Sequence, residues 1–485
     1  MRNTILIFTA LAISAIISIA AHKKVVLPPK PVLPVPTEKQ LAWHEMELNA
    51  FIHFTTNTFT DLEWGNGDES EAIFNPTQFD AGQWVSVLKK AGFKGIILTA
   101  KHHDGFCLWP SQFTGHSVKN SPWMNGKGDV VKAVRDACKQ QGVQFGIYVS
   151  PWDRNHAEYG RAAYIDYYRN QLKELFTAYG PFFEMWFDGA NGGNGYYGGA
   201  KETRRINGAT YYDWPNTLKL VRSIQPGVLF FSDAGPDIRW VGNERGVAGA
   251  TNWNTISTDT IYAGKHGIED LLNKGSEDGT QWIPAEVDVS IRPGWFYHKK
   301  EDSLVKSPER LFEIYLTSVG RGSNLLLNVP PDRRGLVHEN DVRALQGFHK
   351  LLQQEFAVNL AKGTAVKASA VRGNDKRFAA SNLLDGKKDT YWATDDEVTN
   401  GSVEINLSKK TTVKYILLQE YIKLGQRVQS FSVDVWKDNN WTTVANATTI
   451  GYKRILKIDP VETSKIKITI TDSKACPVIS NVEVY

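Results

Sequence analysis

The sequence predicts an α/β protein, with a (β/α)₈-like barrel over residues 37–357 followed by a C-terminal β-sandwich over residues 363–485. A chain of 485 residues suggests two domains. In the first, short apolar runs alternate with amphipathic stretches, as expected for buried parallel strands with covering helices. These apolar runs cover residues 49–55, 95–100, 144–150, 182–188, 228–233, 283–291 and 324–329.

Several of the predicted helices have recognisable ends. One begins at Asp129 and carries an apolar stripe. Another covers residues 164–179 and is followed by Gly180 as a C′ residue. Ser307 before Pro308 is the N-cap signal of a third. The main alternative fold is a doubly wound open sheet, but no glycine-rich phosphate loop follows the first run, which disfavours its nucleotide-binding form.

Beyond about Gly363 the helical periodicity ends and strand-like runs follow. They cover residues 414–418, 430–436, 453–458 and 465–471. Polar and apolar residues alternate in the second of these runs, which is typical of a half-buried strand. Turn residues separate the runs. Together they indicate a β-sandwich.

The N-terminus resembles a secretory signal peptide over residues 1–21. Arg2 precedes a continuous apolar run, and Ser18 and Ala20 offer a cleavage site. An uncleaved anchor is the alternative, because the run approaches the length that spans a bilayer. Residues 22–36 are rich in proline and should form an extended linker. We therefore expect an exported protein, periplasmic or extracellular, without stable membrane insertion after cleavage.

Composition excludes several classes. The formal charge of +4 is small for this length and gives no electrostatic reason to expect a nucleic-acid partner. Cys107, Cys138 and Cys476 are too few for a disulfide framework, and their spacing matches no zinc pattern.

Acidic residues at the ends of the apolar runs are candidates for catalysis. In a barrel, functional side chains lie where strands enter their loops. Asp188 ends the run 182–188 beside aromatic residues and could attack a sugar's anomeric carbon, although a turn-capping role is the alternative. A glycosidase needs a second carboxyl group as proton donor. Glu244 lies in a glycine-flanked loop, and Glu286 is its rival; spacing does not rank them.

The sequence His102-His103-Asp104 allows two interpretations. The three side chains could ligate a metal for assisted hydrolysis. Neighbours on a strand point to opposite faces, however, so the two histidines converge only where the chain has left strand geometry. Neutral imidazoles that hydrogen-bond sugar hydroxyls fit better, and a core role is a further alternative.

Taken together, these stretches resemble the α-L-fucosidases of glycoside hydrolase family twenty-nine. The motifs are IHFTTNTFTDLEWGNG, ILTAKHHDGFCLWPS, GIYVSPWDRN, EMWFDGANGG, GPDIRWVGNERG, IRPGWFYH and NLLLNVPPDRRG, in order between about residues 50 and 335. The C-terminal stretches LLDGKKDTYWAT and GQRVQSFSV are similar to discoidin-like (F5/8 type C) modules. The glycine- and tyrosine-rich segment 192–214 carries none of these motifs and could shape the site that receives the departing sugar.

The resemblance implies an exo-acting, retaining enzyme with fucosylated glycans as partners. Asp188 matches the family's nucleophile, and Glu244 matches the acid/base of the branch acting on α-1,3 and α-1,4 linkages. Two displacements retain configuration and require carboxyl groups about 5 to 5.5 Å apart. The implied substrate-binding residues are His53, Glu63, Trp64, His102, His103, Tyr148, Trp186 and Trp295. No metal or cofactor is required. A structural calcium ion in the C-terminal module is a further implication, although bracing of the barrel is the role we favour for that module.

Overall fold

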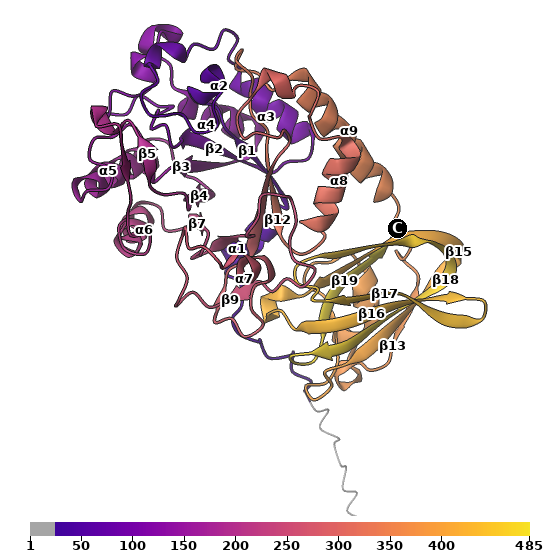
Figure 1. The fold of residues 1–485 in the computed structure, drawn as a ribbon. Coiled ribbons are helices and arrows are strands. Elements are labelled where there is room, and N and C mark those ends of the chain that lie inside the picture. The colour runs from indigo at the N-terminus through magenta and orange to yellow at the C-terminus, as the bar shows by residue number, and fades with distance from the viewer. Residues whose placement is uncertain (1–24) are drawn as a thin grey trace, which may run out of the picture.

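The computed structural model describes residues 25–485, so the predicted signal peptide lies outside the described residues. Eight parallel strands close into a barrel in the order β1-β12-β11-β8-β7-β4-β3-β2, with a separate strand-rich module after it (Figure 1). The predicted fold class is confirmed. The barrel strands are β1 Leu48–Ile52, β2 Gly95–Lys101, β3 Gln144–Val149, β4 Glu184–Trp186, β7 Leu229–Ser232, β8 Ile238–Trp240, β11 Ala285–Ser290 and β12 Asn324–Asn328.

Helices surround the barrel. The longer ones are α3 Ala81–Lys90, α4 Val130–Gln141, α5 Ala163–Ala178, α6 Trp214–Ile224, α8 Pro308–Thr317 and α9 Glu339–Glu355, and the shorter ones α1 Glu38–His44, α2 Asn57–Thr60 and α7 Glu269–Lys274. The predicted N-cap Ser307 is confirmed, because it accepts a hydrogen bond from the Arg310 amide, and the helix predicted to begin at Asp129 is α4, whose N-cap Asp129 accepts one from the Lys132 amide. Gly180 follows the C-cap Tyr179 of α5 and so stands at the predicted C′ position, but it does not have the positive φ of a glycine cap.

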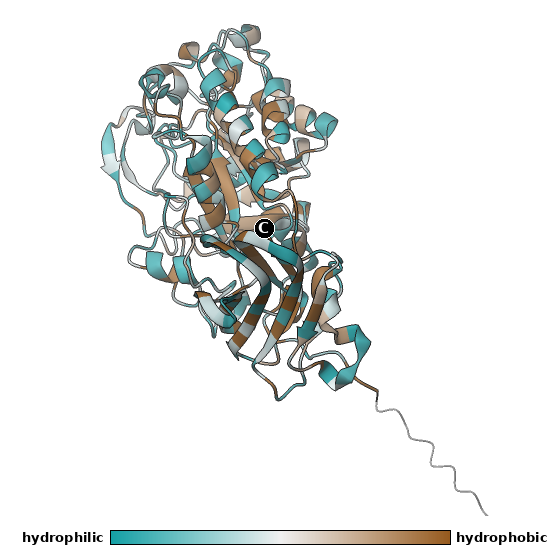
Figure 2. Cartoon of the chain, turned by 90° about the vertical axis from the view of Figure 1, so that its right-hand side faces the viewer, coloured by the Kyte–Doolittle hydropathy of each residue, from teal (hydrophilic) through white to brown (hydrophobic). Residues whose placement is uncertain are grey.

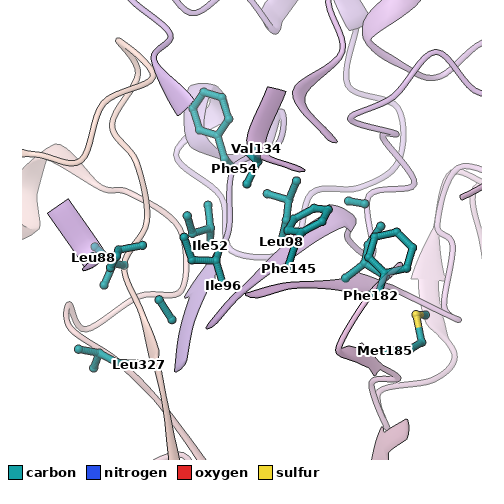
Figure 3. Close-up of a cluster of buried hydrophobic side chains, with 14 of the residues drawn as sticks. Ile52, Phe54, Leu88, Ile96, Leu98, Val134, Phe145, Phe182, Met185 and Leu327 are labelled. Atoms are coloured by element: carbon teal, nitrogen blue, oxygen red, sulfur yellow. The ribbon is translucent and has the colours of Figure 1, made fainter. Parts of the chain in front are cut away.

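Most of the barrel strands contribute to two apolar layers, because successive side chains point to opposite faces. On β2, Ile96 and Leu98 pack outward against the helices, whereas Ile97 packs inside the barrel. Figure 3 shows the outer layer, in which Leu98 lies among side chains from several strands and helices, including Val134 of α4 and Leu88 of α3. Burial on both faces explains why most of the strands read as apolar runs.

Strand β8 was not predicted. It spans only Ile238–Trp240 and follows β7 after residues 233–237, with no helix between them. It pairs with β7 through Phe231 and Ser232, and with β11 through Ala285 and Glu286. A strand this short has too few residues to show periodicity, and the usual βαβ spacing is absent.

A pair of carboxyl groups lies in the barrel interior. Glu184 and Glu286 are both fully buried. The Trp43 indole donates a hydrogen bond to Glu184 at 2.9 Å, and the Trp186 indole donates one to Glu286 at 3.1 Å. Burial raises the pKa of Glu184 to about 8, and burial together with the neighbouring Glu184 holds the pKa of Glu286 well above its usual range.

This pair should make the protein less stable at alkaline pH. The folded state keeps protons that the unfolded chain loses above its ordinary glutamate pKa of 4.5, so stability falls as the pH rises from there through about 8. Each unit of pKa shift corresponds to about 1.4 kcal/mol. We expect Glu184→Gln to flatten the dependence of the melting temperature on pH between 5 and 9, measured by calorimetry. The exposed control Glu397→Gln should leave the slope unchanged, and an unchanged slope in both variants would contradict the assignment.

The C-terminal module is a curled antiparallel sheet around its own core. Its strands are β13 Ala365–Ala368, β14 Trp392–Ala393, β15 Gly401–Glu420, β16 Val428–Lys437, β17 Asn440–Thr448, β18 Arg454–Ser473 and β19 Val478–Val484. The predicted runs 453–458 and 465–471 are two parts of one long strand, β18. Figure 2 shows hydrophobic and hydrophilic residues alternating along these strands, and the apolar ones form the buried core.

The module packs against the barrel beside α7 and β9 (Thr255–Ile256) (Figure 1). Gln426 of the module accepts hydrogen bonds from the main-chain and side-chain amides of Asn254 at 2.8 and 3.0 Å, and it donates one to the Asn252 carbonyl at 2.9 Å. The Asn252 side chain accepts a hydrogen bond from Arg239 at 3.1 Å. Arg239 is fully buried on β8. A continuous set of hydrogen bonds therefore joins the module to strand β8.

Residues 25–36 run along the module without helix or strand. The Val32 amide donates a hydrogen bond to the Leu424 carbonyl at 2.9 Å, and Arg372 donates one to the Leu27 carbonyl at 2.6 Å. These contacts dock the segment on the module. Across residues 25–485, no helix has the length and apolar character needed to cross a bilayer.

Candidate active site

A small chamber opens where the barrel strands end and enter their loops. Its volume is about 100 Å³. Its walls are Phe51, His53, Trp64, His102, His103, Tyr148, Trp186, Asp188, Ala190, Glu244, Asp288 and Trp295. We call it the inner chamber. Every site residue predicted from the sequence lines it except Glu63, so side chains from β1, β2, β3, β4 and the following loops converge as the barrel prediction requires.

A larger chamber of about 400 Å³ adjoins the inner one, and we call it the outer chamber. Trp64, Trp186, Asp188, Ala190, Glu244 and Asp288 line both. The outer chamber is further lined by Trp152, Gly189, Asn191, Gly192, Asp233, Trp240, Gly264, Lys265, His266 and Glu269. The two predicted catalytic carboxyl groups thus stand at the boundary between a small space and a larger one. The start of the glycine- and tyrosine-rich segment 192–214, at Gly192, belongs to the outer wall.

Asp188 is held by donors on both of its oxygens. The Ala190 amide donates a hydrogen bond to one oxygen at 2.7 Å, and the Tyr148 hydroxyl donates one to the other at 2.9 Å. Nε2 of His103 lies 3.8 Å from that second oxygen. The side chain is 23% exposed, which leaves the carboxylate accessible from the chamber. Its orientation is therefore fixed before any ligand arrives.

Glu244 lies on an exposed loop after β8 and faces the same chambers. The Trp295 indole donates a hydrogen bond to it at 3.2 Å. Partial burial of the carboxyl group raises the pKa of Glu244, the hydrogen bond from Trp295 lowers it, and the negative charge of Asp188 raises it further. A raised pKa favours the protonated form of the carboxyl group, which is the form that a general acid needs.

Glu286, the rival of Glu244, lines neither chamber. It is fully buried, and the Trp186 indole donates a hydrogen bond to it. Trp186 itself lines both chambers and stacks on Phe231 at 4.0 Å between ring centroids. The indole thus lies between Glu286 and the chambers, and Glu286 has no direct path to a ligand there.

The three histidines of the inner chamber are neutral near neutral pH. Burial lowers the pKa of His53 and of His103 to about 4, and that of His102 well below its usual range. His53 Nδ1 lies 2.9 Å from the side-chain oxygen of Asn328, and His103 Nδ1 lies 2.7 Å from the Ser150 hydroxyl. These contacts orient the rings, and neutral imidazoles can both donate to and accept from hydroxyl groups.

The structure does not bring Asp104 to the two histidines. Strand β2 ends at Lys101 with an irregular register, and the His102 and His103 rings then lie 4.0 Å apart between centroids. Asp104 is fully buried and accepts hydrogen bonds from the hydroxyls of Thr55 and Thr56 at 2.8 and 2.6 Å. Its carboxyl group is committed to the loop after β1, so the three side chains do not form a metal site.

Glu63 is the predicted site residue that stands behind the wall. One of its oxygens accepts a hydrogen bond from the Trp295 amide at 2.8 Å, and the other accepts one from the Phe296 amide at 3.2 Å. His298 lies 2.6 Å from the second oxygen. Glu63 therefore fixes the loop that carries Trp295, and its side chain is 38% exposed.

The sequence argument missed other polar residues of the site. Asp288 lines both chambers, and the Trp240 indole donates a hydrogen bond to it at 2.8 Å. Burial, together with Glu244, holds the pKa of Asp288 well above its usual range. Asp233 lines the outer chamber, where burial raises its pKa to about 7. The sequence feature that could have identified both residues is an acidic residue within or at the end of an apolar run, because Asp233 ends the run 228–233 and Asp288 lies within the run 283–291.

Two acidic side chains at the open end of a (β/α)₈ barrel, beside aromatic walls and neutral histidines, define the class of glycoside hydrolases. The family model described as "Alpha-L-fucosidase" matches residues 32–355, and the model described as "F5/8 type C domain" matches residues 365–484. The chain belongs to the α-L-fucosidase family, glycoside hydrolase family 29.

Relatives and solved structures agree with this placement. Alpha-L-fucosidase 1 of Arabidopsis thaliana is 40% identical over 94% of this chain and 88% of that protein. A glycoside hydrolase 29 family member from an unknown rumen bacterium is 43% identical, with a TM-score of 0.85 over 94% of this chain and 78% of that one. A Ruminococcus gnavus GH29 fucosidase in complex with fucose is 34% identical, with a TM-score of 0.85 over 95% and 96% of the two chains.

Proposed function

We propose that this α-L-fucosidase is an exo-acting, retaining enzyme that releases terminal α-1,3- or α-1,4-linked L-fucose. The observation that carries the proposal is the position of Asp188 and Glu244, which line both chambers. A single sugar would occupy the inner chamber and the rest of the glycan the outer one. The small volume of the inner chamber, about 100 Å³, supports attack on a terminal residue.

In the first displacement Asp188 attacks the anomeric carbon as the bond to the leaving oxygen breaks. Glu244 gives its proton to that oxygen, and a covalent fucosyl-enzyme forms. Glu244, now a carboxylate, then takes a proton from water as the water attacks the same carbon and releases Asp188. Two inversions retain the configuration. The raised pKa of Glu244 supports its role as proton donor, and the donors on Asp188 support its orientation for attack.

The remaining predicted residues would bind the sugar. His53, His102, His103 and Tyr148 offer donors and acceptors for hydroxyl groups, and Trp64, Trp186 and Trp295 offer apolar faces. Glu63 would act chiefly through the loop that it holds. The leaving sugar would contact Trp152 and Trp240 in the outer chamber.

We also propose export to the periplasm or the extracellular space, on the composition of residues 1–21.

The structural calcium ion in the C-terminal module stays a prediction. At the module's turn in LLDGKKDTYWAT, the two Asp385 oxygens accept hydrogen bonds from the Thr390 hydroxyl at 3.0 and 2.9 Å, and the Lys387 amide donates another at 2.8 Å.

A panel of oligosaccharides carrying α-1,2-, α-1,3-, α-1,4- and α-1,6-linked fucose tests the proposed linkage, with products identified by mass spectrometry. We expect release from the α-1,3 and α-1,4 members, and release at least roughly 10-fold slower from the others, because only a fitting aglycone aligns the bond with both carboxyl groups. Rapid release from the α-1,2 or α-1,6 members would contradict the linkage assignment. No release from any member or from an aryl fucoside would favour a catalytically silent fucose- or galactose-binding protein instead.

Activity should survive exhaustive chelation, because the proposed steps use side chains alone. Within residues 25–485, the cluster of three acidic or histidine side chains close enough to hold a metal is Asp332, His338 and Glu339. Arg334 donates hydrogen bonds to both carboxylates of that cluster, and none of these residues lines either chamber. Loss of aryl fucoside hydrolysis after chelation, restored by a divalent cation, would argue for the metal-dependent alternative.

A further inference from the structure

Glu63 and Asn328, which line neither chamber, hold the loop that carries Trp295 from behind. Trp295 donates the indole hydrogen bond to Glu244, and its main-chain amide donates to Glu63. Its carbonyl oxygen accepts a hydrogen bond from Asn328 at 2.8 Å. The position of the indole, and hence of the hydrogen bond to Glu244, depends on the orientation of Glu63.

Glu63 is oriented in turn by His298. Nε2 of His298 lies 2.6 Å from Glu63, and Nδ1 lies 2.8 Å from Asp61. His298 is buried, with 4% of its surface exposed. Gly294 leaves the room for this contact, since a Cβ atom there would lie 2.6 Å from the Glu63 oxygen and 2.8 Å from the His298 ring.

The His298 ring must carry two protons to satisfy both partners. A carboxylate only accepts hydrogen bonds, and a neutral imidazole has a single N–H donor. Burial lowers the pKa of His298, but the hydrogen bonds to Glu63 and Asp61 raise it more, so the net shift is upward. The charge of Glu301 also raises it, while Lys300 and Arg333 face Asp61. The ring is therefore stabilised as an imidazolium.

We propose that His298 is a positioning residue for the reaction: the Asp61–His298 pair holds Glu63, which holds the Trp295 loop and thereby directs the indole to the acid/base Glu244. The inference rests on the proposed role of Glu244. When His298 loses its second proton, one of its two carboxylate contacts is lost. The hydrogen bond from Trp295 also lowers the pKa of Glu244, so releasing the loop raises that pKa.

The test compares His298→Gln with His116→Gln. His116 is a matched control because it is also buried, pairs with a carboxylate (Glu71, 2.7 Å), has a raised pKa and lines neither chamber. For His298→Gln we expect kcat/KM on a fucosylated oligosaccharide to fall roughly 10- to 100-fold, with a smaller loss on a 4-nitrophenyl fucoside. The alkaline limb of its kcat/KM–pH profile should move to higher pH. His116→Gln should match the wild type in both respects.

A profile of unchanged shape in His298→Gln, or an equal loss on both substrates, would overturn the inference. If His298→Gln does not fold, Asp61→Asn gives the same test. Asp61 is exposed, and its replacement removes the carboxylate that holds Nδ1 of His298. The alkaline limb of the kcat/KM–pH profile should again move to higher pH. Glu244→Ala is measured in parallel. If Glu244→Ala loses more activity on the oligosaccharide than on the aryl fucoside and His298→Gln does not, only the role of His298 is refuted. If Glu244→Ala loses equally on both substrates, the proposed role of Glu244 is refuted, and the role of His298 with it.

Discussion

Replacing Asp188 with glycine should lower kcat for aryl fucosides by about 10⁴-fold, because the covalent intermediate can no longer form. The side chain is partly exposed and its contacts are to Ala190, Tyr148 and His103, so the barrel should still fold. The measurement is single-substrate kinetics on a 4-nitrophenyl fucoside, with circular dichroism to confirm the fold.

Azide makes this experiment specific for the nucleophile. The shortened side chain leaves a space below the sugar, so azide should restore turnover and yield fucosyl azide of inverted configuration. Asp233→Asn is the matched control, since Asp233 lines only the outer chamber and should stay far more active. Time-resolved NMR of the wild type should show α-fucose as the first product. Initial β-fucose, or substantial unaided activity of the Asp188→Gly variant, would refute the two-displacement mechanism.

Replacing Glu244 with alanine should slow the hydrolysis of oligosaccharides by about 10²- to 10⁴-fold, the usual contribution of a general acid. Fucosides with activated aryl leaving groups should lose far less in the first step, because their oxygen departs without a proton. The dependence of kcat/KM on leaving-group pKa, measured over a series of aryl fucosides, should therefore become steeper than in the wild type.

Glu286→Ala is the informative comparison. Glu286 lies behind the Trp186 indole in the barrel interior, so its loss should lower the stability and act on all substrates alike. A leaving-group dependence that steepens in Glu286→Ala and not in Glu244→Ala would reassign the acid/base role. Azide should also speed the second step of Glu244→Ala, giving fucosyl azide of retained configuration, and should have no such effect on Glu286→Ala.

Much of the barrel was predictable because its strands are buried on both faces and read as apolar runs. Strand β8 was not predictable, because a strand of three residues is too short to show an alternating hydrophobic pattern and no helix separates it from β7. In the module, residues 453–458 and 465–471 looked like two strands because residues 459–464 between them are mostly polar or charged. They form one strand, β18, because backbone pairing with β15 continues through that stretch.

The candidate site was predictable where a polar residue follows an apolar run, as at His53 and Asp188. The choice between Glu244 and Glu286 was not, because the apolar run 283–291 does not show that Glu286 lies near the start of β11, whereas Glu244 follows the end of β8. Glu244 faces the chambers from a loop, and Glu286 faces the barrel interior. Contacts between distant segments, such as His298 with Asp61 and Glu63, have no signal in a single sequence.

The contacts that run from Gln426 through Asn252 to Arg239 bear on how such chains can be divided or recombined. A fragment ending at residue 357 would lose Gln426, and with it the hydrogen bonds to the two Asn254 amides and the Asn252 carbonyl, which would then face solvent. The strand that carries Arg239 leads directly to the loop of Glu244. A chimera that joins this barrel to a foreign module would need to supply an equivalent of Gln426 to keep the contacts with Asn252 and Asn254.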